Sequence, residues 1–285
     1  MLPSIRALVV LVALLAVALG GCSTKPPVPP RAIELNRDGA LALAAGDLTT
    51  AHARLELATE YSPRFTEAWV NLGLVEMQRG NLDLAYKHLR RARDLNGDLP
   101  APHHAIGLLA QRRGLDGEAE KSYKEALVVD PGFAPARANL ARMYYGQGRF
   151  DAARLEYLKL TQAAPRELAG HLGLVECLWK LEREGEADEA LGRARERFGD
   201  VPDLRVLVAR QLLRRDAPED AEEILAPLTQ TNDRARAATA WAWIGVARLS
   251  RGDHGGAAAA AREGARLDAN EPVGRWLRAK LSAGG

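Results

Sequence analysis

The sequence contains few of the residues that build sheets or covalent frameworks. Only 5% of its 285 residues are aromatic, and it has two cysteines, at positions 22 and 177. Ile, Thr and Phe, which favour strands, are scarce beside Ala, Leu, Arg and Glu. This composition predicts an all-α fold, and the wide separation of the two cysteines argues against a structural disulfide.

The sequence also lacks a dominant charge and the known catalytic patterns. Its 39 basic and 37 acidic residues nearly cancel, without a long run of one sign, which argues against binding to nucleic acid. No glycine-rich phosphate loop, nucleophile elbow, metal-binding cysteine pair or His-Glu-x-x-His pattern is present. We therefore predict that the protein is not an enzyme and has no bound cofactor or metal.

Two isolated features have a structural and a functional interpretation. His103 and His104 are adjacent, but neighbours on a helix point about 100° apart, so a structural role is favoured over metal binding. Cys177 lies among apolar residues of a predicted helix, which favours a packed thiol over a reactive one.

The first residues have the form of a secretory signal. Arg6 is followed by an apolar stretch from Ala7 to Leu19, and Gly20-Gly21-Cys22 closes the segment. About 13 apolar residues are too few for a comfortable bilayer span, which needs about 20. A cleaved signal peptide over 1–21 is therefore favoured over a permanent transmembrane helix.

The tetrapeptide Leu19-Gly20-Gly21-Cys22 resembles the lipobox of bacterial lipoproteins. The resemblance implies that Cys22 becomes the first mature residue, with a thioether diacylglycerol and an amide-linked acyl chain that anchor it to a membrane. Ser23 after the cysteine resembles an outer-membrane sorting signal, which implies the periplasmic face. Residues 22–31 then form a proline-rich tether of polyproline type.

From about residue 32 the sequence repeats every 34 residues. One column holds alanines: Ala51, Ala85, Ala119, Ala153, Ala187 and Ala221. A column four residues later holds Leu or Tyr, and one twelve residues earlier holds a small residue in most units. Glycines five residues before the alanines in four units, and Pro or Gly at the unit ends, predict two helices per unit.

A helical hairpin with this period resembles the tetratricopeptide repeat. Trp69, Leu72, Gly73, Ala85 and Leu89 match the positions typical of that family. The resemblance implies a superhelical solenoid over residues 32–271, with a seventh unit shifted by two residues. The predicted units are 32–65, 66–99, 100–133, 134–167, 168–201, 202–235 and 238–271.

Two departures from the repeat have consequences for structure. Glu182 and Asp216 replace the turn glycine in units five and six. Residues 272–285 form the tail, in which Trp276, Leu277 and Leu281 have helical spacing. They predict a capping helix that shields the last apolar face of the solenoid.

In the tetratricopeptide family, side chains of the first helices line a groove that binds peptides. Carried over position by position, that geometry predicts a groove of mixed apolar, amide and charged side chains, which suits a peptide or an amphipathic helix. The predicted groove residues are Asn71, Leu74, Met77, His104, Leu108, Gln111, Asn139, Arg142, Tyr145, Glu176 and Trp179.

A lipobox followed by a short tether and a full-length repeat array resembles the pilotins of type IV pili, the PilF/PilW/Tgl group. This resemblance implies a periplasm-facing outer-membrane lipoprotein that helps a secretin assemble, with a secretin subunit as its protein partner. The alternative is an envelope adaptor that recruits peptidoglycan enzymes or a gliding or secretion complex. The sequence alone does not separate these two interaction roles.

Overall fold

The computed structural model describes residues 27–283. The predicted signal peptide, the lipobox Leu19-Gly20-Gly21 and the lipidated Cys22 lie outside the described residues. Within them the fold is all-α, as predicted, and no strand is present.

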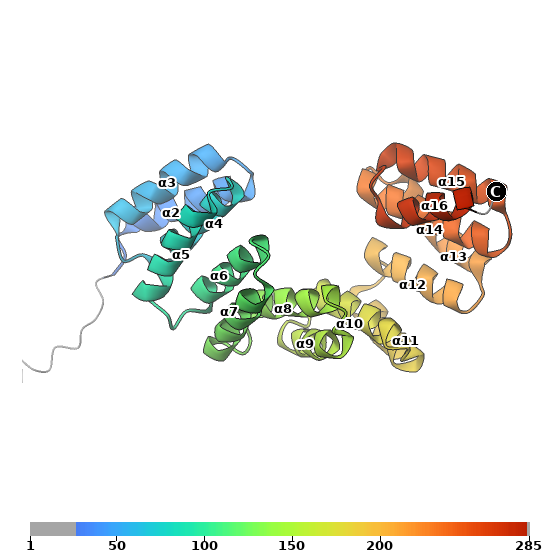
Figure 1. The fold of residues 1–285 in the computed structure, drawn as a ribbon, viewed down its shortest axis with the longest axis horizontal. Coiled ribbons are helices and arrows are strands. Elements are labelled where there is room, and N and C mark those ends of the chain that lie inside the picture. Colours follow the sequence, from blue (N-terminus) through green and yellow to red (C-terminus); the bar gives the residue numbers. More distant parts are fainter. Residues whose placement is uncertain (1–26, 284–285) are drawn as a thin grey trace, which may run out of the picture. The chain divides into compact units, whose positions relative to one another are not determined.

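The helices follow one another as antiparallel pairs joined by short turns (Figure 1). Their bounds are α2 Pro30–Ala44, α3 Leu48–Tyr61, α4 Thr66–Gln78, α5 Leu82–Leu95, α6 Pro100–Arg112, α7 Asp116–Val129, α8 Ala134–Gly146, α9 Phe150–Ala163, α10 Leu168–Lys180, α11 Glu184–Phe198, α12 Pro202–Arg214, α13 Pro218–Leu225, α14 Arg234–Ser250, α15 His254–Leu267 and α16 Pro272–Ala283. The pairs α2/α3 to α14/α15 each pack together, as in a tetratricopeptide solenoid.

The chain divides into two compact units, Met1–Gly97 and Asp98–Gly285. The described part of the N-terminal unit contains α2–α5. The C-terminal unit contains α6–α16, and each unit is described by itself below.

The three sequence columns meet at one contact inside a hairpin. A Cβ added at Gly73 of α4 would lie 2.5 Å from Leu89 and 3.3 Å from the carbonyl oxygen of Ala85, both on α5. Gly39 has the same relation to Leu55 and Ala51. Because only a hydrogen occupies this space, the two backbones approach closely, and all six column alanines are fully buried.

In the fourth hairpin, the large side chain of the second helix packs in a different place. Its first helix has Ala141 where the third hairpin has Gly107, against which the Tyr123 ring packs. The corresponding Tyr157 of α9 lies against Gly173 of the following helix α10, where an added Cβ would be 2.3 Å from the ring. The large side chain therefore fills space between successive hairpins rather than within its own.

The turn between the helices of a hairpin requires a left-handed residue. Gly148 has φ +73°, and the next amide, that of Arg149, donates to the Tyr144 carbonyl across the helix end. Glu182 and Asp216 adopt the same conformation, each with φ +58°. The turn geometry is therefore kept in units five and six, although residues other than Gly, Asn and Asp rarely adopt this conformation.

The two-residue shift before the seventh unit has a visible cause. Helix α13 has only eight residues, and Ala226–Gln230 continues it as a 3₁₀ helix that begins just before Pro227. Proline lacks the amide hydrogen that an α-helix interior requires. Helix α14 then starts at Arg234 behind Asp233, whose carboxylate accepts from the Arg236 amide at 3.0 Å.

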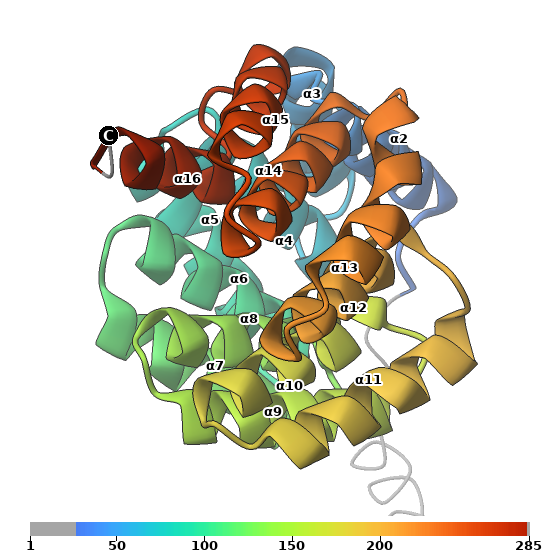
Figure 2. The same cartoon turned by 90° about the vertical axis from the view of Figure 1, so that its right-hand side faces the viewer.

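Helix α16 packs on α14 and α15 at the end of the C-terminal unit (Figure 2). Leu277 is fully buried against Gly245. Trp276, which was expected to share in this shield, is 52% exposed. That expectation was wrong, because the residue before Leu277 lies about 100° away around the helix.

The left-handed turns of units five and six predict a gain in stability on substitution. Glu182→Gly should raise the free energy of unfolding by about 1 kcal/mol, and Asp216→Gly by less, because Asp tolerates this conformation better than Glu. Urea unfolding followed by circular dichroism measures both. Gly148→Ala is the matched control and should lower stability by about 1 kcal/mol; a gain in the control would contradict this explanation.

Candidate functional site

Side chains about 34 residues apart link successive first helices. In the N-terminal unit, Asn71 of α4 donates to Asn36 of α2 at 2.9 Å. In the C-terminal unit, Asn139 of α8 lies 2.7 Å from the His104 ring of α6, and Arg210 of α12 pairs with Glu176 of α10. We call the row of half-buried side chains in the C-terminal unit the first-helix face; it comprises His104, Asn139, Tyr145, Leu172, Glu176, Val206, Arg210, Thr239 and Trp243.

The predicted groove residues are divided between the two units. Asn71, Leu74 and Met77 lie on α4 in the N-terminal unit and are half-buried. The other eight lie on α6, α8 and α10 in the C-terminal unit. The binding role of all eleven stays a prediction.

On α6 and α8 several predicted groove side chains already bind one another. Gln111 accepts a 2.6 Å hydrogen bond from Tyr123 of the second helix α7, and Leu108 packs against the adjoining core. Arg142 is exposed and donates to Asn139 at 2.6 Å. Burial lowers the pKa of His104 to about 4, so its ring is neutral at pH 7 beside Asn139.

Tyr145 joins α8 to the next first helix. Its ring packs edge-on against Phe150 at 5.4 Å. Burial and then the carboxylate of Glu176 raise its pKa above the usual value. The neighbouring Cys177 is fully buried with a pKa raised to about 12 by burial, which agrees with a packed thiol rather than a reactive one.

Arg210 is the centre of the first-helix face. Its guanidinium forms a two-bond pair with Glu176, and its Cζ lies 5.0 Å from the ring centroids of both Trp179 and Trp243. One cation thus contacts α10 and α14 from α12. Cation–π and bidentate carboxylate contacts together suit arginine rather than lysine.

Trp179 differs from its predicted role as an open groove residue. It is only 5% exposed, belongs to the core of α10–α12, and lies beneath Arg210 and Arg214. Its indole N–H has no hydrogen-bond acceptor among the described residues. The ring therefore supports the first-helix face from below.

Sequence reasoning missed the continuation of this face onto α12 and α14. Val206 and Arg210 follow Leu172 and Glu176 by 34 residues, so the repeat itself could have identified them. Trp243 was harder to place, because the 3₁₀ segment Ala226–Gln230 shifts the register of α14.

A cavity of about 400 Å³ opens on the first-helix face between α10, α12 and α14. Leu172, Val206, Leu207 and Thr239 form its apolar and neutral part. Its charged lining consists of Glu176, Asp203, Arg210, Asp233 and Arg236. Its volume is within the range of about 300–1,000 Å³ that is usual for ligand pockets.

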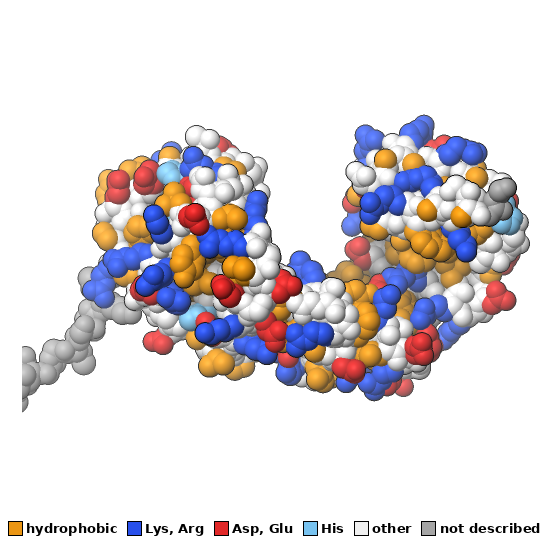
Figure 3. Space-filling model, in the orientation of Figure 1, with side chains coloured by type: hydrophobic (Ala, Val, Ile, Leu, Met, Phe, Trp, Pro, Cys, Tyr) orange, Lys and Arg blue, Asp and Glu red, His pale blue; other side chains and the backbone are white. Residues whose placement is uncertain are grey.

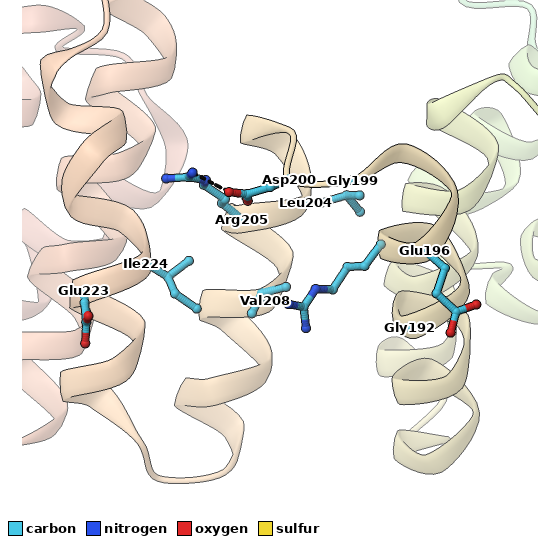
Figure 4. A pocket seen from close by; sticks show the side chains of 10 residues that line it. Gly192, Glu196, Gly199, Asp200, Leu204, Arg205, Val208, Glu223 and Ile224 are labelled. Carbon is cyan, nitrogen blue, oxygen red and sulfur yellow. Dashed lines mark hydrogen bonds and ion pairs between the residues drawn. The ribbon is translucent and has the colours of Figure 1, made fainter.

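A larger cavity of about 840 Å³ lies between α11, α12 and α13 on the second-helix side (Figure 4). Leu204 and Val208 line it but are only 1% and 8% exposed. Asp200 and Arg205 pair across its rim, with Arg205 Nε 2.8 Å from Asp200 Oδ1. Ile224 of α13, which is half-buried, adds apolar surface to this cavity.

Charged side chains of both signs are interspersed over the visible surface of each unit (Figure 3). Among residues 27–283, no group of three or more His, Cys, Asp or Glu side chains could hold a metal ion. No helix in this range combines the length and hydropathy needed to cross a membrane.

Family comparison agrees with this architecture. Two models described as tetratricopeptide repeat match residues 39–100 and 117–169. The chain carries tetratricopeptide repeats. The first match covers the end of α2 with α3, α4 and α5, and the second covers most of α7 with α8 and α9.

Two curated relatives resemble the tetratricopeptide region in sequence. The type IV pilus assembly protein PilF of Pseudomonas aeruginosa is 28% identical over 152 residues, which cover 53% of this chain and 50% of PilF. Superkiller complex protein 3 of Mus musculus is 26% identical over 151 residues, covering 51% of this chain and 10% of that protein. The match thus spans half the length of one relative and a tenth of the other.

Solved tetratricopeptide structures have the same fold. The P. aeruginosa PilF structure has a TM-score of 0.59 and 21% identity and covers 75% of this chain and 97% of its own. PilW, a type IV pilus biogenesis factor, has a TM-score of 0.60 and 19% identity, with coverage of 74% and 98%. At this identity the likeness concerns the fold alone.

The Arg210 cluster predicts a specific stability difference. Arg210→Lys should lower the free energy of unfolding by about 1–2 kcal/mol, because Lys keeps the charge but loses the bidentate pair and the ring stacking. The side chains of Arg210 and Glu176 are each only 24% exposed, so water screens this pair weakly.

Arg205→Lys on the same helix is the matched control. Its partner Asp200 is 69% exposed, so this change should shift stability by less than about 0.5 kcal/mol. Equal urea midpoints for the two variants would contradict the role given to Arg210.

Proposed function

We propose that this chain is an outer-membrane lipoprotein, anchored through Cys22, that holds a secretin subunit during assembly of a type IV pilus. The tetratricopeptide array acts as a protein-binding scaffold and performs no catalysis. In this role the lipid keeps the scaffold at the periplasmic face of the membrane, and the first-helix face contacts the secretin.

The observation that carries this proposal is the sequence similarity to PilF over half of each chain. PilF is a type IV pilus assembly protein by name, and PilW, with the same fold, is a pilus biogenesis factor. The similarity to superkiller complex protein 3 extends over 151 residues, almost the same length of this chain. It supports the scaffold role but not the pilus role.

The chemistry of the first-helix face suits a protein ligand. Tyr145, Leu172, Val206 and Trp243 offer half-buried apolar and aromatic surface. Amide and charged groups on the same face can fix the orientation of a bound segment. Apolar anchors of this kind supply most of the binding energy in protein interfaces.

The anchor is proposed from the sequence alone. The lipobox and the apolar segment before it would direct the attachment of a diacylglycerol and an acyl chain to Cys22. More than one acyl chain gives stable attachment to a bilayer. The proline-rich residues that follow would keep the repeats close to the lipid surface.

Photocrosslinking in living cells tests the proposed partner. A benzoylphenylalanine at Tyr145 keeps an aromatic ring on the first-helix face and should capture a secretin subunit. The same residue at Val128, which is 82% exposed on the second helix α7, is the control and should not capture it.

Each other outcome has a distinct meaning. A peptidoglycan hydrolase or a gliding or secretion component at Tyr145 would replace the pilotin role with the adaptor role. Capture at Val128 alone would show that the second-helix side binds the partner.

In the same cells, Cys22→Ala should move the protein from the membrane to the soluble fraction, because the variant has no thiol to carry the lipid. Retention in the membrane would contradict the lipid anchor.

A further inference from the structure

We infer that the cavity between α10, α12 and α14 receives a lysine or arginine of the bound protein, with apolar residues on either side of it. This inference rests on the proposed function of the first-helix face and specifies the chemistry of the bound segment. It follows from the charges and the apolar surface of the cavity.

The cavity contains more carboxylates than cations. Three carboxylates, those of Glu176, Asp203 and Asp233, line it with two guanidiniums, those of Arg210 and Arg236, which leaves one net negative charge. The carboxylate of Glu176 already forms a bidentate ion pair with Arg210. Arg236 is shared between the two aspartates.

The contacts of Arg236 are uneven. Its Nη1 lies 3.1 Å from Asp233 Oδ2, whereas its Nη2 lies 3.9 Å from Asp203 Oδ2. The side chain of Asp203 is 51% exposed and that of Asp233 is 44% exposed. Asp203 therefore has the weakest internal pairing of the cavity and is open to an incoming cation.

Both aspartates lie at the N-terminus of a helix. Asp203 lies in the first turn of α12, and Asp233 caps α14. The partial positive charge at a helix N-terminus favours carboxylates there. A ligand cation would complete the charge balance without displacing an existing bond.

An acidic ligand would fit the same cavity poorly. Both guanidiniums are already paired, so an added carboxylate would meet Asp203 and Asp233 without a free cation to accept it. Like charges in contact across an interface are strongly unfavourable. The charge pattern therefore selects basic over acidic segments.

The apolar part of the cavity explains the flanking residues. Leu172, Val206 and Thr239 come from three successive first helices and are half-buried beside the aspartates. The methylene stem of a lysine or arginine can lie along such surface while its charged end reaches a carboxylate. Neighbouring apolar side chains of the same segment can then cover the rest.

A crosslinker inside the cavity tests the inference. Benzoylphenylalanine at Thr239 in the full chain should capture the same protein as Tyr145 does. Mass spectrometry of the joined peptides should find a Lys or Arg within about four residues of the attachment point, one helical turn, flanked by apolar residues. An acidic or uncharged segment at that place would overturn the inference.

Charge removal gives a second readout. The double variant Asp203→Asn/Asp233→Asn keeps a capping oxygen on α14 and should lower the yield of this crosslink at limiting partner about five-fold or more, on the scale of one or two exposed ion pairs. Asp220→Asn, in the first turn of α13 and outside the cavity, is the matched control and should change nothing. Thermal unfolding of both variants checks that they fold.

Exchanging the charges of the two partners distinguishes recognition of the basic residue from a general loss of binding. Asp203→Lys should abolish the crosslink, and a glutamate in place of the basic residue of the captured segment should restore it. No effect of either aspartate change would overturn the inference. Capture at Tyr145 without capture at Thr239 would also overturn the inference but would leave the proposed function intact. Absence of capture at both positions would contradict the inference and the proposed function alike.

Discussion

The close approach of the two helices in a hairpin is the contact on which the rest of this structure depends. At Gly39, Gly73 and Gly107 an added Cβ would lie 2.5 Å from a large side chain of the second helix. Protein interiors are packed too tightly to absorb such an overlap without movement of the backbone. Glycine therefore fixes the spacing between the two helices in each of these three hairpins.

The fifth and sixth hairpins lack this glycine, and several polar contacts join them to each other. Val175 and Ala209 occupy its place in α10 and α12. Between these hairpins Arg210 pairs with Glu176, Arg214 pairs with Glu184, and Gln211 and Arg215 contact Asp188. The cavity proposed to bind a partner lies at this same junction. Charge-assisted and bidentate hydrogen bonds thus hold this junction, and such bonds add geometric specificity as well as energy.

The 34-residue columns were sufficient to predict paired helices and the close contact inside the first three hairpins, because buried small and large residues recur there at fixed helical positions. They could not show whether a given side chain is buried or exposed, because this depends on side chains from neighbouring helices. Trp179 was predicted to be open, yet the guanidiniums of Arg210 and Arg214 cover it. Trp276 was predicted to be shielding, yet it faces solvent. The division at Gly97 also left no signal in the periodic pattern, since the repeat continues through it.

The central role of the glycine contact is tested most directly by comparing Gly107→Ala with Gly192→Ala. The added methyl at Gly107 would meet the Tyr123 ring, whereas nothing lies within 4 Å of it at Gly192, in the middle of α11. Gly107→Ala should lower the free energy of unfolding by about 1–3 kcal/mol. Gly192→Ala should raise it by up to about 1 kcal/mol, because alanine favours the helix. Equal stabilisation by both substitutions would contradict the dependence of the fold on this close approach.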